Sequence, residues 1–177
     1  MGEALDLIRL PSMHQDLLDL LIALDGVRQD PRYHPEGDAL YHSLQVFDLA
    51  RRESADRALW AAALLHDVGK AVSSPDHDEV GADLLDGLLA PRVVWLVRHH
   101  LDLLRVPVPT KRHLRGTAAL ADLQRLRRWD VGGRSRTASV LEPAAAVALL
   151  LDGAPTSLLS PFGGEPAPFD APRKETF

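Results

Sequence analysis

The sequence predicts an all-α protein that folds as a single helical bundle. Aromatic residues make up only 5% of the 177 residues, and no segment alternates β-branched with polar residues as a half-buried strand does. Apolar residues instead recur at helical spacing along most of the chain. The hydrophobic content of 46% is sufficient for one domain with a core of its own.

The first two helices are expected to begin at side chains that can cap them. A helix is predicted over about residues 12–24, with Ser12 as its N-cap and Gly26 just beyond its end. Residues 28–37 contain two prolines and are interpreted as a polar loop. Asp38 can then cap a second helix.

The next two predicted helices are separated by a turn. Ser54 can cap a helix over residues 55–67, and Gly69 is placed to stop it. The turn over residues 73–76 leads into a helix that begins near residue 77 and ends near residue 89.

Three further helices are expected. They cover about residues 91–104, residues 114–130 with a possible break at Gly116, and residues 143–151. Pro107 and Pro109 interrupt the helical pattern between the first two of these. Residues 153–177 are rich in proline and glycine, which predicts an extended or disordered tail after a domain of residues 1–152. Phe162 or Phe169 could dock this tail on the domain.

Two adjacent ionisable residues, His66 and Asp67, follow an apolar run that ends at Leu65. Burying an imidazole and a carboxylate together is unfavourable unless something compensates for it. A divalent metal ion would do so, since it binds both groups, and it could activate water or clamp a phosphate. The other residues that could join this pair are His42, His77, His99, His100 and Asp130.

Each of these residues also has an ordinary structural explanation. His42 alone could be a hydrogen-bonded core histidine, and a bare His-Asp pair is common. Asp130 alone could be a surface carboxylate, although a helix C-terminus disfavours negative charge. The order of the residues along the chain therefore favours a site more than any one residue does.

That order, one histidine, then His-Asp, then a distant aspartate, resembles the signature of the HD superfamily of metal-dependent phosphohydrolases. The sequence is more closely similar to the HD domain of bacterial CCA-adding tRNA nucleotidyltransferases over about residues 30–136. The similar segments cover residues 33–43, 63–70, 77–82, 96–100 and 130–134. No segment resembles the polymerase-like head of those enzymes, so we do not expect the chain as given to add CCA.

The resemblance implies that one metal ion is bound by His42, His66, Asp67 and Asp130. It also implies a possible second ion at His77 and one of the pair His99 and His100. Neighbouring side chains on a helix point about 100° apart, so only one of this pair can face the site, and we favour His100. The mixed nitrogen and oxygen ligands favour Mn, Ni, Co, Fe or Mg over a structural zinc ion.

The candidate catalytic and substrate-binding residues follow from the mechanism that the resemblance implies and from charged residues near the motifs. Asp67 is expected to be the bridging carboxylate of the metal site and to take up a proton from the nucleophile. Lys70 is interpreted either as a phosphate contact with a catalytic role or as an ordinary solvated lysine. Arg98 and Arg134, with Lys70, are expected to bind the negative charge of the substrate. The basic residues of 111–115, with Arg125, Arg127 and Arg128, are interpreted either as flanking the entrance of the site or as a solvated helix face.

The function implied is a metal-dependent phosphohydrolase that uses metal-activated water on nucleotide phosphomonoesters or 2′,3′-cyclic phosphodiesters. The alternative is a non-catalytic HD module that binds a nucleotide or an RNA end. A net charge of −5 does not favour nucleic acid overall, so the expected partner is a small phosphorylated substrate. With no cysteine, no secretory signal and no apolar run of about 20 residues, we expect a cytoplasmic protein that does not enter a membrane. The oligomeric state stays open.

Overall fold

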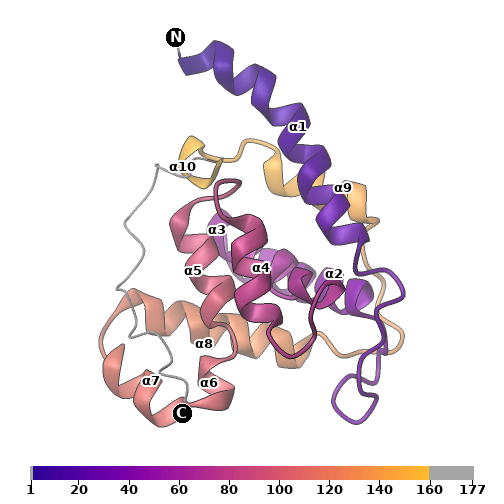
Figure 1. Ribbon diagram of the computed structural model, residues 1–177, viewed down its shortest axis with the longest axis vertical. Helices are drawn as coiled ribbons and strands as arrows, with labels where there is room; N and C mark the ends of the chain where they lie inside the picture. Colours follow the sequence, from indigo (N-terminus) through magenta and orange to yellow (C-terminus); the bar gives the residue numbers. More distant parts are fainter. Residues whose placement is uncertain (1, 160–177) are drawn as a thin grey trace.

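The computed structural model describes residues 2–159, with the side chains of residues 12–155, 158 and 159, and this part of the chain is helical (Figure 1). The predicted all-α fold is confirmed: the described residues contain no strand, and their one bridge, between Arg28 and Asp38, is isolated. In chain order the elements are α1 (Gly2–Ile22), α2 (Ala39–Glu53), α3 (Arg57–Leu65), the 3-10 turn η1 (Val68–Ala71), α4 (His77–Leu85), α5 (Pro91–His99), α6 (Asp102–Arg105), α7 (Pro107–His113), α8 (Ala118–Gly132), α9 (Pro143–Leu151) and α10 (Thr156–Leu159).

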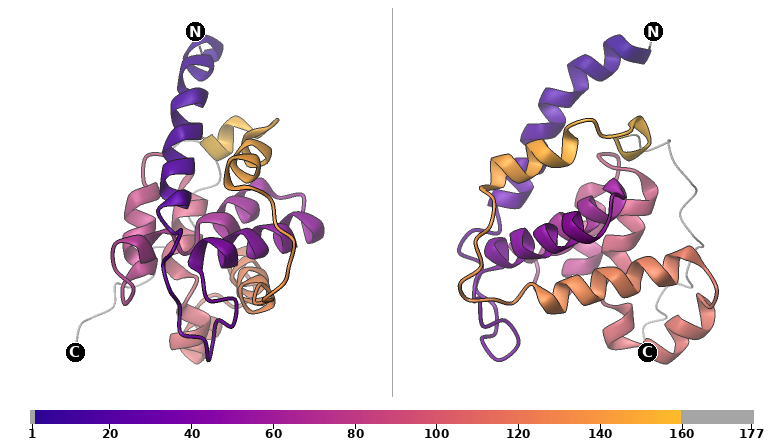
Figure 2. Two further views of the ribbon diagram at one scale, coloured as in Figure 1. Left: turned by 90° about the vertical axis from the view of Figure 1, so that its right-hand side faces the viewer. Right: turned by 180° about the vertical axis from the view of Figure 1, so that it is seen from behind.

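Helix α2 is the centre of the bundle and packs against both α3 and α8. Helix α3 packs in turn on α5, and α5 packs on α4. Helix α1 lies on α9 through the stripe Met13, Leu17 and Leu21, whose four-residue spacing puts them on one face, and its N-terminal half extends beyond the bundle (Figures 1 and 2). The largest buried side chains of the core include Phe47 and Trp129.

Two predicted N-caps lie elsewhere. Helix α1 already includes Pro11 and Ser12, so Ser12 does not begin it. Ser54 ends α2, and α3 is capped instead by Asp56, whose carboxylate accepts a hydrogen bond from the backbone N–H of Ala58. Serine and aspartate are comparable caps, so composition alone could not decide between Ser54 and Asp56.

The prolines after α5 start a helix rather than interrupting one. The predicted helix over residues 91–104 ends at His99, and the short α6 follows it. Helix α7 then begins at Pro107, because the fixed φ of proline and its missing N–H suit a first helical turn. The break at Gly116 is confirmed: its φ is +79°, and Thr117 caps α8 directly after it.

Helical structure continues past the predicted domain end at residue 152. Helix α10 docks on the body through Leu158, which is buried and whose carbonyl accepts a hydrogen bond of 2.9 Å from the N–H of Ala90. Phe162 and Phe169, predicted as docking residues, lie outside the described residues. Among the helices of the described part, none is both long and apolar enough to cross a bilayer.

Candidate metal centre

The six predicted metal ligands meet inside the bundle, and all of their side chains are buried. They come from separate elements: His42 from the first turn of α2, His66 and Asp67 from the junction of α3 and η1, His77 from the start of α4, His100 from the end of α5, and Asp130 from the last turn of α8. Since α3 packs on both α2 and α5, the His-Asp junction lies between the other histidines.

Asp67 is the centre of this cluster, and its two carboxylate oxygens face different pairs of histidines. Oδ2 lies 3.4 Å from Nε2 of His66 and 3.9 Å from Nε2 of His42. Oδ1 lies 3.2 Å from Nε2 of His77 and 3.8 Å from Nε2 of His100. The cluster thus forms two groups of potential ligands that share one carboxylate.

Three of the histidines are oriented in the same way by the backbone. In each, Nδ1 lies within hydrogen-bond distance of the carbonyl three residues earlier. The distances are 3.0 Å from His66 to Ala63, 2.7 Å from His77 to Ser74 and 2.6 Å from His100 to Val97. A carbonyl can only accept, so Nδ1 carries a proton in each ring, and Nε2 is the nitrogen that faces Asp67.

Nε2 of His66 and Nε2 of His100 are buried and have no hydrogen-bond partner among the described residues. Burial lowers the pKa of His66 to about 3, so its ring stays neutral instead of gaining a proton. A buried acceptor without a partner is costly, and a neutral imidazole beside an ionised carboxylate is the donor set of a divalent metal. The residues therefore fit a metal ion.

His42 differs from the other three histidines because both of its nitrogens contact carboxylates. Nε2 lies 3.1 Å from Oδ1 of Asp130, and Nδ1 lies 2.8 Å from Oε1 of Glu36 and 2.9 Å from the carbonyl of Gly133. Burial alone would lower the pKa of His42, but the contacts with Asp130 and Glu36 outweigh it and raise the pKa to about 9.

The two aspartates are held in their ionised form. Burial acts to raise the pKa of Asp67, but the Lys70 ammonium and the hydrogen bond from His77 overcome it and keep the pKa well below its usual range. Burial likewise opposes ionisation of Asp130, and its hydrogen bond with His42 lowers the pKa more. Arg127 adds an ion pair of 2.6 Å to Oδ2 of Asp130.

Two of the three predicted substrate-binding residues lie beside the cluster. Nζ of Lys70 is 2.6 Å from Oδ2 of Asp67, and Nη2 of Arg134 is 3.4 Å from Oδ1 of Asp130. Arg98 does not join them, because it forms ion pairs with Glu79 and Asp83, both on α4.

The adjacent histidines at the end of α5 point to different surroundings. His100 turns towards Asp67, as described above. His99 places Nδ1 2.7 Å from Oδ2 of Asp102 and packs its ring on Trp95, with the ring centroids 4.5 Å apart. The roughly 100° turn between neighbouring helical residues explains the divergence.

Gly69 brings the cluster together by close packing rather than by ending a helix. Helix α3 ends at Leu65, and Gly69 lies within η1 against the start of α4. A Cβ atom at this position would lie 2.1 Å from the backbone oxygen of His77 and 2.6 Å from the backbone nitrogen of Gly81. Only glycine permits this approach, which holds His77 next to Asp67.

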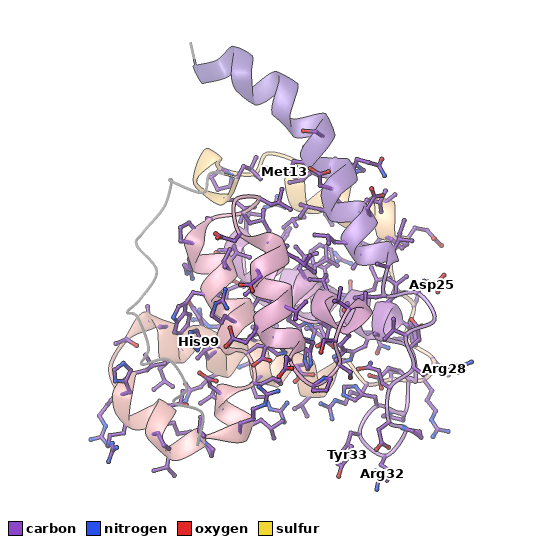
Figure 3. All side chains as sticks on the ribbon, viewed as in Figure 1. Met13, Asp25, Arg28, Arg32, Tyr33 and His99 are labelled. Carbon is purple, nitrogen blue, oxygen red and sulfur yellow. The ribbon has the colours of Figure 1, made fainter. Side chains whose placement is uncertain are left out.

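The loop over residues 28–37, predicted only as polar, folds back to the cluster. Gln29 donates its N–H to the carbonyl of Gly37 at 3.0 Å, and the φ of +79° at Gly37 lets the chain turn into α2. Arg32 and Tyr33 lie at the outer end of the loop (Figure 3). The side-chain oxygen of Gln29 accepts a hydrogen bond of 2.5 Å from Lys70.

Sequence reasoning missed two residues of this loop, His34 and Glu36. Both lie on His42: Oε1 of Glu36 contacts its Nδ1, and the ring of His34 packs edge-on at a centroid distance of 4.9 Å. The available signal is a carboxylate just before a glycine turn that leads directly into the helix of a predicted ligand.

The comparisons agree with this geometry. The sequence model of the HD domain matches residues 39–132, which is just over half of the chain. Similar curated proteins are each named Multifunctional CCA protein. The one from Halorhodospira halophila is 40% identical over 101 residues, 48% of this chain and 24% of that protein. The one from Hahella chejuensis is 41% identical over 81 residues, covering 42% and 19%, and the one from Methylococcus capsulatus is 43% identical over 72 residues, covering 37% and 17%. The match thus spans about a quarter or less of the length of these relatives.

Proposed function

The chain belongs to the HD domain family, and from this premise we propose that it is a metal-dependent phosphohydrolase. One observation carries the proposal most strongly. His66 and His100 direct buried, unpartnered lone pairs towards opposite oxygens of the same carboxylate, Asp67. Such an arrangement is unfavourable in the absence of a ligand and suits divalent cations.

Two groups of residues would hold the ions. His42, His66, Asp67 and Asp130 form the first group, and Asp67, His77 and His100 form the second. A divalent ion such as Mn, Ni, Co, Fe or Mg, when bound, supplies Lewis acidity towards a phosphoryl oxygen and an activated water. Because the pKa of Asp67 is held well below its usual range, this carboxylate would stay ionised and would be available to both groups of ligands rather than take up a proton.

The charged side chains beside the cluster supply positive charge for a phosphate. Lys70 and Arg134 each contact a carboxylate of the cluster, so a substrate phosphate seated there would lie within reach of both cations. Gln29 and the carbonyl of Tyr33 hold these two side chains in place. We assign Arg98 no role in substrate binding, because it forms ion pairs with two carboxylates of α4.

We propose nucleotide phosphomonoesters or 2′,3′-cyclic phosphodiesters as the substrate class, including the end of an RNA. The similarity to Multifunctional CCA proteins supports this class over other phosphate esters. The test is hydrolysis of 2′,3′-cyclic AMP and of simple phosphomonoesters by protein loaded with Mn, Ni, Co or Mg in turn. We expect turnover that requires the metal and is lost in Asp67→Ala and strongly reduced in His100→Ala.

His99→Ala is the matched control, since His99 is the neighbour of His100 but its ring contacts the carboxylate of Asp102 instead of that of Asp67. Circular dichroism and the melting temperature (Tm) would establish that each variant is folded. Loss of turnover in His99→Ala equal to that in His100→Ala would contradict the assignment. Tight metal binding without turnover on any substrate would favour a non-catalytic module that binds a nucleotide or an RNA end.

A further inference from the structure

The ring of His42 is oriented by different contacts from those of the other histidines in the cluster. The rings of His66, His77 and His100 are each fixed by a carbonyl of their own local turn. His42 lies within α2, and its Nδ1 instead contacts two groups outside that helix, the carbonyl of Gly133 far along the chain and the carboxylate of Glu36 in the preceding loop.

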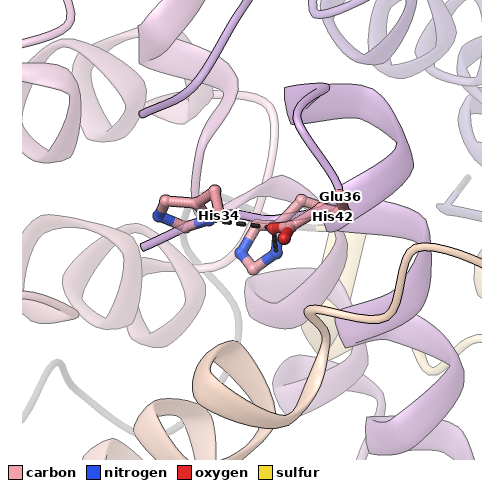
Figure 4. A group of neighbouring side chains, drawn as sticks. All are labelled: His34, Glu36 and His42. Carbon is pink, nitrogen blue, oxygen red and sulfur yellow. Dashed lines mark hydrogen bonds and ion pairs between the residues drawn. The ribbon is translucent and has the colours of Figure 1, made fainter. Parts of the chain in front are cut away.

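Glu36 is directed inwards to this contact and is not a surface carboxylate. Its side chain is 0% exposed, and its Oε1 lies 2.8 Å from Nδ1 of His42 and 2.9 Å from Nδ1 of His34 (Figure 4). Its other oxygen, Oε2, is buried without a hydrogen-bond partner. A buried carboxylate is costly, so its retention next to His42 needs a compensating interaction, which the two imidazole N–H groups provide.

We propose that Glu36 is a positioning residue, which fixes the ring of His42 so that Nε2 is presented to the metal ion. The inference rests on the metal centre of the proposed function. A carboxylate behind a ligating imidazole selects the tautomer, holds the ring plane and makes the far nitrogen a stronger ligand. Glu36 thereby extends the centre into the loop over residues 28–37.

The same three residues, His34, Glu36 and His42, are close enough to be considered as a separate ion site. The hydrogen bonds argue against this reading. Nδ1 of His42 also lies 2.9 Å from the carbonyl of Gly133, which can only accept, so Nδ1 carries a proton and offers no lone pair. Glu36 therefore accepts hydrogen bonds here and acts on the ion through His42.

The test compares metal binding by the parent with binding by Glu36→Gln and Glu36→Ala. Dissociation constants for Mn²⁺ and Co²⁺, the number of ions per chain, the Co²⁺ absorption spectrum and the Tm of the metal-free protein are measured. We expect Glu36→Ala to bind about 10- to 100-fold more weakly with an altered Co²⁺ spectrum. Glu36→Gln keeps an acceptor at the same place and should recover part of the loss. The number of ions per chain should not change.

Asp30→Asn is the matched control, because Asp30 belongs to the same loop but pairs with Arg32. It should bind metal as the parent does. Three results would overturn the inference: binding by Glu36→Ala within about twofold of the parent, a lower Tm with an unchanged Co²⁺ spectrum, or loss of one ion per chain in both Glu36→Ala and His34→Ala. None of these readouts depends on turnover. A parent that binds metal but hydrolyses nothing therefore contradicts only the proposed function, and a parent that binds no metal refutes both.

Discussion

Replacing Gly69 with alanine tests how the packing of η1 against α4 supports the metal centre. The added Cβ would lie 2.1 Å from the backbone oxygen of His77, about 1.3 Å short of ordinary van der Waals contact at 3.4 Å. It would also lie 2.6 Å from the nitrogen of Gly81. These are backbone atoms and cannot rotate away, so η1 and α4 must separate.

The size of the effect follows from that separation. Overpacking of this kind costs about 1–3 kcal/mol, and a chain of this length loses about 2–4 °C of Tm per kcal/mol, so we expect Tm to fall by about 2–12 °C. Ligands must keep their places to within about 0.5 Å, and the required movement exceeds this. Nε2 of His77, now 3.2 Å from Oδ1 of Asp67, would move away, and metal affinity should fall as well.

The assay is a thermal melt of the metal-free protein together with titration by Mn²⁺. Gly87→Ala is the control: Gly87 has a φ of +77° and nothing within 4 Å of the added Cβ, so the substitution costs about 1–2 kcal/mol through the backbone alone. Both variants should melt earlier, but only Gly69→Ala should bind metal more weakly. Parent-like metal affinity in Gly69→Ala would refute the reasoning.

Two further predictions concern protons and capping. In the metal-free protein the pKa of His42 is raised to about 9 from the ordinary 6.5, so below pH 9 an ion must displace a proton from Nε2. Apparent Mn²⁺ affinity should therefore rise between pH 7 and pH 9, and a flat profile by isothermal titration calorimetry would contradict this. Thr117→Ala removes the hydroxyl that accepts from the N–H of Leu120 at 3.3 Å, so stability should fall by about 1 kcal/mol and Tm by about 2–4 °C. Thr117→Ser should melt as the parent does, metal binding should be unaffected, and equal melting of Thr117→Ala and the parent would show that the cap contributes nothing.

The sequence was informative about the metal centre because its ligands lie on regular helices. Helical periodicity predicted the elements that carry His42 and Asp130, and the adjacency of His66 and Asp67 at the end of an apolar run marked the pair at its centre. The choice of His100 over its neighbour rested on the angle between successive helical side chains, and the structure turns His100 to Asp67.

The features that the sequence did not predict depend on tertiary contacts rather than on helical periodicity. Glu36 reaches His42 only because the loop closes on itself, and a loop of polar residues has no periodicity to indicate it. Arg98 was assigned by its nearness in sequence to His100, but it forms ion pairs with Glu79 and Asp83 of α4. Ser54 and Asp56 are both good caps, and the structure uses Asp56, whose carboxylate also forms an ion pair with Arg92.

The shared carboxylate of Asp67 has a consequence for the order in which ions would load. One negative charge would be divided between two dications, and the group with His77 and His100 has no other carboxylate of its own, whereas the group with His42 also has Asp130. An ion bound in the group that includes Asp130 would draw negative charge from Asp67 and place a positive charge beside the other group. The second ion would therefore bind more weakly than the first. Such negative cooperativity would make the two-ion form sensitive to the free metal concentration while the one-ion form persists.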